Sequence, residues 1–258
     1  MSIDISKGIK IGVGSQGEVY KMDDLLIKKT KDGKGEVEVL KIIEKHSKLK
    51  KYFPIYKSSF IKDRVYYIIT DYIDGINLGE FLKEERTIDC YGYLNIFKQL
   101  IQGLNMLHKK DIVHRDIKLE NIIINNNLEI KYIDMGSSCC VKDTICMMKK
   151  RGTPYYLSPE LIKLYFEDKF NDGYDNSVDD YKKSDIWALG VTLFSLLYKK
   201  KPFDAINTNI LYRNILETEP IYHSNCFYLN NILQHMLYKD HNKRYNTDQL
   251  LVLINKYQ

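Results

Sequence analysis

The sequence lacks a long apolar run. No stretch approaches the ~20 consecutive apolar residues that a helix needs to cross a membrane. The first residues, MSIDISKGIK, contain no apolar core of a secretion signal, and no internal repeat or low-complexity segment stands out. We therefore expect neither a membrane partner nor a secretion route.

Cysteine is too irregularly placed to indicate a disulfide framework. The chain has five cysteines, an odd number, and no C-x-x-C pair occurs. We expect free thiols in a reducing setting, the cytoplasm or nucleus, or the host cell cytoplasm if the source is a virus or a parasite. A redox-sensing role for Cys139 and Cys140 is the alternative to ordinary thiols. The full set is Cys90, Cys139, Cys140, Cys146 and Cys226.

Charge of one sign does not dominate the composition. There are 39 Lys and Arg against 34 Asp and Glu, a net charge of +5. This excess is too small to indicate nucleic-acid binding, and the basic run at 45–51 is interpreted as a solvated face. With 258 residues, 44% of them hydrophobic, the chain can bury the core of one large domain or two small ones.

Hydrophobic periodicity divides the chain into a strand-rich first part and a helical remainder. The segment 70–75 connects the two parts, and a crevice between two lobes is a natural ligand site. The helix at 184–198 is apolar on nearly all sides, which indicates that it is buried. Strands are predicted at 9–11, 18–20, 25–27 and 65–69, and helices at 36–46, 91–108, 184–198, 230–238 and 247–256.

A glycine-rich stretch, GVGSQGEV, occupies residues 12–19 between two predicted strands. Glycine lets the backbone turn tightly and approach phosphate oxygens, so that its N–H groups can bind them. A flexible hairpin explains this pattern equally well, and the strand that follows argues against a dinucleotide fold. In the next strand Lys28 shares a face with Leu26, where it could hold phosphate, although strand lysines more commonly reach water.

The stretch HRDIKLEN, residues 114–121, is the most specific part of the sequence. It brings Asp116, Lys118 and Asn121 close together. Phosphoryl transfer requires a base, a cation and an oxygen ligand for a metal ion. A predicted hairpin turning at 125–127 would return Asp134 to the Asn121 end, where its carboxylate would complete a Mg²⁺ site. An aspartate before a glycine is also ordinary at a turn.

With these motifs in this order, the chain resembles the eukaryotic protein kinase family from end to end. HRDIKLEN is similar to the family's catalytic loop, DMG at 134–136 stands in the D-F-G position, and SPE at 158–160 stands in the A-P-E position. The resemblance implies a single kinase domain over 1–258 with an α+β, bilobal protein-kinase-like fold. A small strand-rich N-lobe with one main helix is expected over 1–70, a hinge over 71–77 and a larger helical C-lobe over 78–258.

The resemblance also implies an activity, the transfer of the γ-phosphate of ATP to a serine or threonine of a protein with Mg²⁺, or with Mn²⁺ in its place. Asp116 would accept the hydroxyl proton, Lys118 would stabilise the moving phosphate, and Asn121 and Asp134 would hold the metal. Lys118 and the GTPYY at 152–156 are typical of serine/threonine kinases. The implied ATP-binding residues are Gly12, Val13, Gly14, Ser15, Gln16, Gly17, Val19, Leu26, Lys28, Glu36, Thr70, Asp71, Ile73, Asn77 and Ile123.

Further residues are implied to brace or regulate the site. Glu36, rather than Glu38, is expected to pair with Lys28, and Met135 is expected to fill the family's phenylalanine position beside Leu40 and Tyr56. The bracing and regulatory set is His114, Arg115, Met135, Thr144, Thr153, Glu160, Asp185 and Arg244.

Three roles within the bracing set are specific contacts. By the same resemblance Asp185 braces the catalytic loop and Thr153 bonds near Asp116 and Lys118. Arg244 pairs with Glu160.

Arg115 is the residue that in many relatives grips an activating phosphate. Few acceptors lie in the segment 134–160, and Thr144 is the best of them. We therefore expect activity without activating phosphorylation.

Several features leave alternatives open. Leu26 stands where the family has alanine, and Thr70 stands at the gatekeeper position behind the adenine. The acidic insert 165–180 is either a solvated loop or a docking strip for a basic partner. Glu120 favours a basic substrate, whereas the basic run at 149–151 favours an acidic one.

The rival functions are a pseudokinase serving as a nucleotide-binding scaffold or regulator, and a kinase of a small molecule or lipid. We expect a monomer that acts on a protein substrate.

Overall fold

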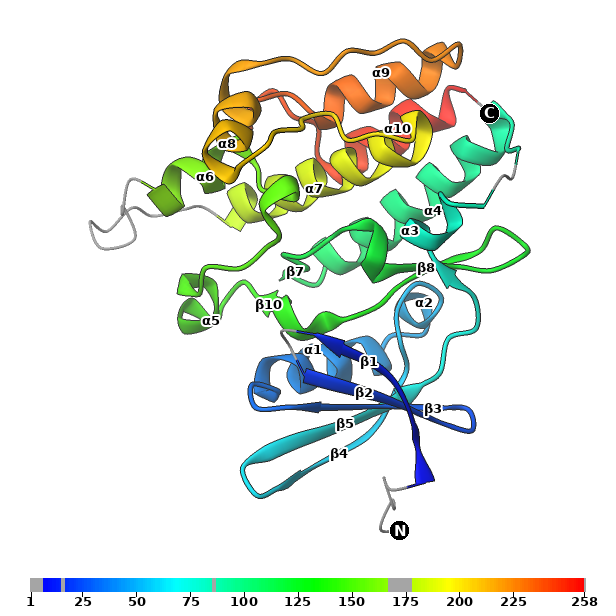
Figure 1. Ribbon diagram of the computed structural model, residues 1–258, viewed down its shortest axis with the longest axis vertical. Coiled ribbons are helices and arrows are strands. Elements are labelled where there is room, and N and C mark those ends of the chain that lie inside the picture. The colour runs from blue at the N-terminus through cyan, green and yellow to red at the C-terminus, as the bar shows by residue number, and fades with distance from the viewer. Residues whose placement is uncertain (1–6, 15–16, 85–86, 167–177, 258) are drawn as a thin grey trace.

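The computed structural model describes residues 7–14, 17–84, 87–166 and 178–257 of the chain. A strand-rich lobe with α1 lies at one end of the molecule and a helical lobe at the other (Figure 1). The strands are β1 (Ile9–Gly14), β2 (Gly17–Met22), β3 (Leu25–Thr30), β4 (Tyr56–Lys62), β5 (Val65–Asp71), β6 (Ile76–Asn77), β7 (Ile112–Val113), β8 (Ile122–Ile124), β9 (Ile130–Tyr132) and β10 (Cys139–Cys140). The α-helices are α1 (Lys34–Glu44), α2 (Ser47–Lys50), α3 (Leu78–Phe81), α4 (Cys90–His108), α5 (Thr144–Met148), α6 (Pro159–Phe166), α7 (Val178–Tyr198), α8 (Thr208–Glu217), α9 (Phe227–Met236) and α10 (Thr247–Asn255).

The N-lobe is built on an antiparallel five-stranded sheet in the order β1-β2-β3-β5-β4. Alternation in β3 and the β-branched and aromatic residues of β5 favour these two central strands. Helix α1 places Val37, Leu40 and Ile43 in the core and leaves Glu38 exposed. This spacing is the one that predicted a helix over 36–46.

The C-lobe is organised around two long helices, α4 and α7. Asp89 caps the N-terminus of α4 by accepting a hydrogen bond from the Gly92 N–H. Trp187 and Phe194 of α7 are almost fully buried, which confirms the prediction of a buried helix at 184–198. The observed α7 begins earlier, at Val178.

Two small sheets lie between the lobes and carry the segments of interest. Strands β8 and β9 form the predicted hairpin, with Ile122 opposite Tyr132, and β6 pairs with the other side of β8. Strand β7 pairs with β10, so that residues just before the HRDIKLEN stretch lie beside residues just after DMG.

Strand β4 and helices α6 and α8 were not predicted. Lys57, Ser58 and Ser59 are polar, so β4 shows no clear alternation, and as an edge strand it is largely exposed. Sheet position rather than sequence pattern therefore decides its structure.

The expectation of free thiols is wrong for four cysteines. The structure joins Cys90 to Cys226 and Cys139 to Cys146 as disulfides, with Cα separations of 5.8 Å and 6.1 Å. The first pair is 136 residues apart in sequence and is brought together where α4 and α9 begin. Sequence spacing cannot reveal such a pair. Cys140 is a free thiol.

Within the described ranges, no helix combines the length and the apolar character that crossing a bilayer would demand.

Candidate active site

A cavity of 620 Å³ opens between the two lobes. The glycine-rich stretch and β3 form one wall, the connector after β5 forms the back, and residues 120–123 and 133–135 form the opposite wall. Of the expected ATP-binding residues, those lining it are Gly12, Val13, Gly14, Gly17, Val19, Leu26, Lys28, Glu36, Thr70, Asp71, Ile73, Asn77 and Ile123. Ser15 and Gln16 lie outside the described residues.

Two neighbouring side chains of β3 and β5 line the cavity. Leu26 and Thr70 are opposite one another in the β3–β5 pair, and Thr70 is buried. Asn77 lines the cavity, but its Oδ1 accepts a hydrogen bond from the Glu80 N–H at 2.9 Å, because Asn77 caps α3. This contact was not expected for a residue predicted to reach the ribose.

A buried lysine links the two lobes at the inner end of the cavity. Lys28 Nζ lies 2.8 Å from Glu36 Oε2 of α1 and 2.6 Å from Asp134 Oδ1. Lys29, its neighbour in β3, faces the other way and pairs with Glu18 at 3.1 Å. Glu38 is exposed, so the structure brings Glu36 and not Glu38 to Lys28.

The two carboxylates keep this lysine charged. Burial lowers the pKa of Lys28, but Glu36 and Asp134 raise it more, so that it ends above the ordinary value. Burial raises the pKa of Asp134, whereas the Lys28 ammonium and the Gly136 N–H lower it further than that. Asp134 is therefore an anion beside a cation at neutral pH.

The hairpin returns Asp134 to the catalytic loop as predicted. The Ile133 N–H donates to the Asn121 carbonyl at 2.8 Å, directly before Asp134. Asp134 adopts a left-handed conformation with φ 59° and accepts a hydrogen bond from the Gly136 N–H at 3.2 Å. Met135 is buried in the short 3₁₀ turn η3 (Met135–Ser137), which packs against α1.

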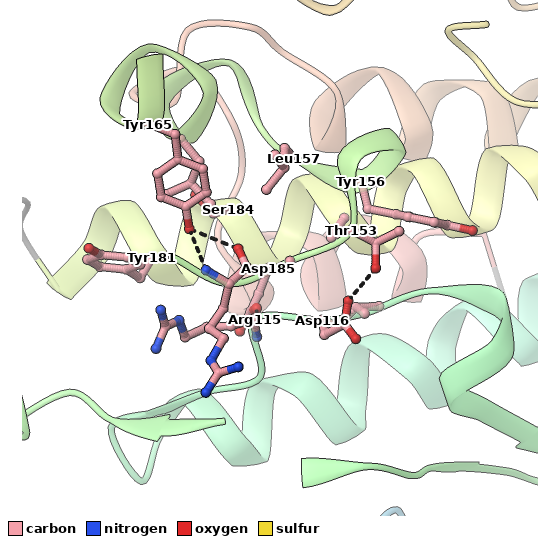
Figure 2. A pocket seen from close by; sticks show the side chains of 14 residues that line it. Arg115, Asp116, Thr153, Tyr156, Leu157, Tyr165, Tyr181, Ser184 and Asp185 are labelled. Atoms are coloured by element: carbon pink, nitrogen blue, oxygen red, sulfur yellow. Dashed lines mark hydrogen bonds between the residues drawn. The ribbon is translucent and has the colours of Figure 1, made fainter. Parts of the chain in front are cut away.

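The catalytic loop places an acid, a cation and an amide around one point. Lys118 Nζ lies 2.9 Å from Asp116 Oδ2, and Asn121 Nδ2 donates to the Asp116 carbonyl at 2.8 Å. The Thr153 hydroxyl donates to Asp116 Oδ1 at 2.8 Å and accepts from Lys118 Nζ at 3.1 Å. Figure 2 shows the hydrogen bond between Thr153 and Asp116 as a dashed line. The predicted contact of Thr153 with both residues is confirmed.

A carboxylate from α7 holds the start of this loop. Asp185 accepts the backbone N–H groups of His114 and Arg115, both at 2.8 Å, and lies 3.0 Å from His108 Nε2. These are contacts that its predicted bracing role requires, while His108 was not anticipated from sequence. His114 is fully buried, and burial lowers its pKa despite the nearby carboxylates.

The end of the 134–160 segment is fixed to the C-lobe core by an ion pair. Arg244, 0% exposed, donates to Glu160 at 2.7 Å and 3.1 Å. Burial raises the pKa of Glu160, and Arg244 lowers it more strongly, to below the ordinary value. The predicted pairing of Arg244 with Glu160 is confirmed.

Arg115 bonds to the backbone of the segment that follows β10. Its guanidinium donates to the carbonyl of Cys146 at 2.8 Å and to the carbonyl of Lys149. Thr144 is exposed as the first residue of α5. The acidic insert falls mostly on residues 167–177, outside the described residues.

A metal site is compatible with these residues. Asn121 uses Nδ2 in its bonds to Asp116, and Lys28 and the Gly136 N–H approach Oδ1 of Asp134. An amide oxygen and a carboxylate oxygen are the hard ligands that Mg²⁺ prefers, alongside water and phosphate. Among the described residues no group of three or more His, Cys, Asp or Glu side chains forms a metal cage. The donor set thus suits an ion carried in with a phosphorylated ligand.

Comparison with known proteins gives a consistent result. Residues 5–253 match the protein kinase domain family. The chain is 32% identical over 277 residues to the probable serine/threonine-protein kinase nek3 of Dictyostelium discoideum, covering 96% of this chain and 23% of that protein. It is 28% identical over 221 residues to the rat phosphorylase b kinase gamma catalytic chain, liver/testis isoform, covering 84% and 52%. The chain thus spans from about a quarter to half of the length of these relatives.

Proposed function

Since this chain belongs to the protein kinase family, we propose that it transfers the γ-phosphate of ATP to a serine or threonine hydroxyl of a protein, with Mg²⁺ or Mn²⁺ as the metal. The observation that carries this proposal is the set of side chains gathered at one cavity. Lys28, Glu36, Asn121 and Asp134 line it, Lys28 pairs with both carboxylates, and Asn121 bonds to Asp116, whose carboxylate lies 2.9 Å from Lys118 Nζ.

The nucleotide would lie in the interlobe cavity with its adenine between Leu26 and the connector. Lys28 would hold the α- and β-phosphates, because Glu36 fixes the direction of its side chain and Asp134 keeps it protonated. Asn121 and Asp134 would hold the metal ion, which when bound offsets the negative charge of the phosphate oxygens.

In the proposed reaction Asp116, Thr153 and Lys118 have separate roles. Asp116 orients the attacking hydroxyl and accepts its proton, and Thr153 fixes the carboxylate through the 2.8 Å hydrogen bond to Oδ1. Lys118, near Oδ2, is placed to stabilise charge on the transferring phosphate. Positioning and electrostatic stabilisation together supply most of the catalysis in such a reaction.

Serine/threonine specificity is supported by the contact of Lys118 and Thr153 with Asp116, and by the names of the relatives. A protein substrate is the corresponding proposal for the partner.

The test is phosphate transfer by the purified chain to a peptide library, with wild type compared with Asp134→Asn and Asp116→Asn. Asparagine tolerates the left-handed backbone of residue 134, so Asp134→Asn should fold normally. We expect each variant to lose at least about a hundredfold in turnover, since each removes a charge aimed at the reacting groups. Removal of Mg²⁺ by a chelator should abolish transfer by the wild type.

Asp63→Asn is the matched control, because Asp63 is exposed at the β4–β5 turn far from the cavity and also has a positive φ. Full activity in Asp134→Asn would contradict the metal assignment. Binding of Mg²⁺ and ATP with no transfer above the level of Asp116→Asn would instead identify a nucleotide-binding pseudokinase.

A further inference from the structure

Two cations of the segment after α5 converge on one carboxylate of the N-lobe. Lys149 Nζ and Arg151 Nη2 each lie 2.9 Å from Oδ2 of Asp32, across sequence separations of 117 and 119 residues. Asp32 lies in the loop between β3 and α1. We call Asp32, Lys149 and Arg151 the interlobe clasp. It lies away from the Lys28 ion pairs and also joins the two lobes.

The C-lobe side of the clasp is held on both flanks. Arg115 donates to the carbonyls of Cys146 and Lys149, which ties the segment to the catalytic loop. The Tyr165 hydroxyl of α6 accepts from the Arg151 N–H at 3.1 Å and donates to the Arg151 carbonyl at 2.8 Å. Figure 2 shows these two hydrogen bonds as dashed lines at the Tyr165 hydroxyl. The backbone that presents the two cations is therefore restrained by Arg115 on one side and Tyr165 on the other.

The N-lobe side is equally restrained. The Asp32 N–H donates to the Thr30 hydroxyl at 3.3 Å. The next residue, Gly33, lies so close to Tyr66 that a Cβ there would be 2.6 Å from the Tyr66 Cβ. Helix α1 begins directly after Gly33 and carries Glu36 in its first turn. A restraint on Asp32 therefore also restrains the N-terminal end of α1, where Glu36 pairs with Lys28.

Charge and geometry make this contact more than a chance surface pair. The side chains of Asp32, Lys149 and Arg151 are 57%, 46% and 32% exposed, and one exposed ion pair stabilises little by itself. Here two cations share one oxygen, and their backbones are restrained before the pair forms. Less side-chain and chain entropy is then lost in making the contact. The Lys149 hydrogen bond lowers the pKa of Asp32, so the carboxylate is charged at neutral pH.

We propose that Asp32 is a positioning residue, whose carboxylate couples the segment 146–151 to α1 and so holds Glu36 against Lys28 without activating phosphorylation. The proposal rests on the kinase activity proposed above. In this arrangement a carboxylate of the N-lobe binds cations of the segment 146–151. A phosphate on the segment would make the same link with the charges reversed, the anion on the segment and the cations on the N-lobe.

The test measures kcat, KM for ATP and hydrogen exchange on protein shown by mass spectrometry to carry no phosphate. Asp32→Asn should lower kcat about fivefold, as expected for the loss of roughly 1 kcal/mol of coupling. Exchange should rise in both α1 and residues 146–151. Asp32→Glu should recover most of the activity, and Asp63→Asn, which removes the same charge from the same lobe, should match wild type.

A double-mutant cycle separates the clasp from a general charge effect. The pair of changes Lys149→Gln and Arg151→Gln should lower kcat as much as Asp32→Asn, and combining all three should add little. Additive losses, or exchange and kcat in Asp32→Asn equal to those of Asp63→Asn, would overturn the proposal. If the wild type transfers no phosphate, the proposed kinase activity fails, while exchange in α1 still decides the clasp.

Discussion

At the scale of single residues, the back of the cavity depends on Thr70. Thr70 is the cross-strand partner of Leu26 in the β3–β5 pair and is 5% exposed. Leu26 is larger than the alanine that the kinase family has at this position, whereas Thr70 is small. These two side chains line the cavity proposed to hold adenine, which allows a test with ligands of different size.

Thr70→Met should weaken the binding of bulky adenine-site inhibitors by at least about tenfold, because the longer side chain enters the space behind the adenine. The KM for ATP should change little. Inhibition constants and KM values for wild type and variant measure this. Thr70→Val, which keeps the volume, is the control, and equal inhibitor affinity in Thr70→Met and wild type would contradict the prediction.

At the scale of elements, the segment from 134 to 160 is secured at its far end by Glu160. This residue lies in the first turn of α6 and bonds to Arg244. Arg244 also donates to the carbonyls of Lys183 and Tyr238 and lies 5.0 Å from the Trp187 ring. An arginine this deeply buried depends on its partner, because an unpaired buried charge is costly.

Glu160→Gln should therefore destabilise the C-lobe by about 3 kcal/mol, which lowers the melting temperature by roughly 10 °C. Asp111→Asn provides the comparison, since Asp111 pairs with Lys182 at a similar distance of 2.8 Å but is largely exposed. Its effect should stay below about 1 kcal/mol. Thermal and urea unfolding of both variants measure the difference; equal losses would mean that burial does not govern the strength of these pairs.

The elements also show where sequence reasoning succeeds. HRDIKLEN and DMG are contiguous motifs whose chemistry depends on residue type and order, so the contact of Thr153 with Asp116 and the return of Asp134 to the Asn121 end could be anticipated. The ion pair of Asp134 with Lys28 was not anticipated. The contact of Asp32 with Lys149 could not be anticipated, because it joins ordinary charged residues 117 positions apart. Strand β4 was missed because its polar residues carry no period, and its sheet partner decides its structure.

At the scale of the whole molecule, Cys90–Cys226 connects α4 to α9 over 136 residues. Closing so long a loop restricts the unfolded chain, which stabilises the folded state by up to about 5 kcal/mol in the chain-entropy account. Neither the odd number of cysteines nor their spacing indicated this link, since it depends on how the helices pack.

Reduction of the protein should accordingly lower the melting temperature by several degrees, and Cys90→Ser should reproduce most of the loss. Cys140→Ser, which removes the free thiol, is the control and should leave the reduction effect intact. Mass spectrometry after thiol labelling identifies the paired cysteines. If all five cysteines of the unreduced protein take up label, the disulfides do not form in solution.

The hydrogen bonds from Arg115 to the Cys146 and Lys149 carbonyls have a consequence for how such an enzyme could be controlled. A contact made by backbone carbonyls is present as soon as the chain folds, and it contains no phosphate that a phosphatase could remove. Activity would then follow the amount of folded protein, so that synthesis and degradation, rather than a reversible mark, would set its level in time.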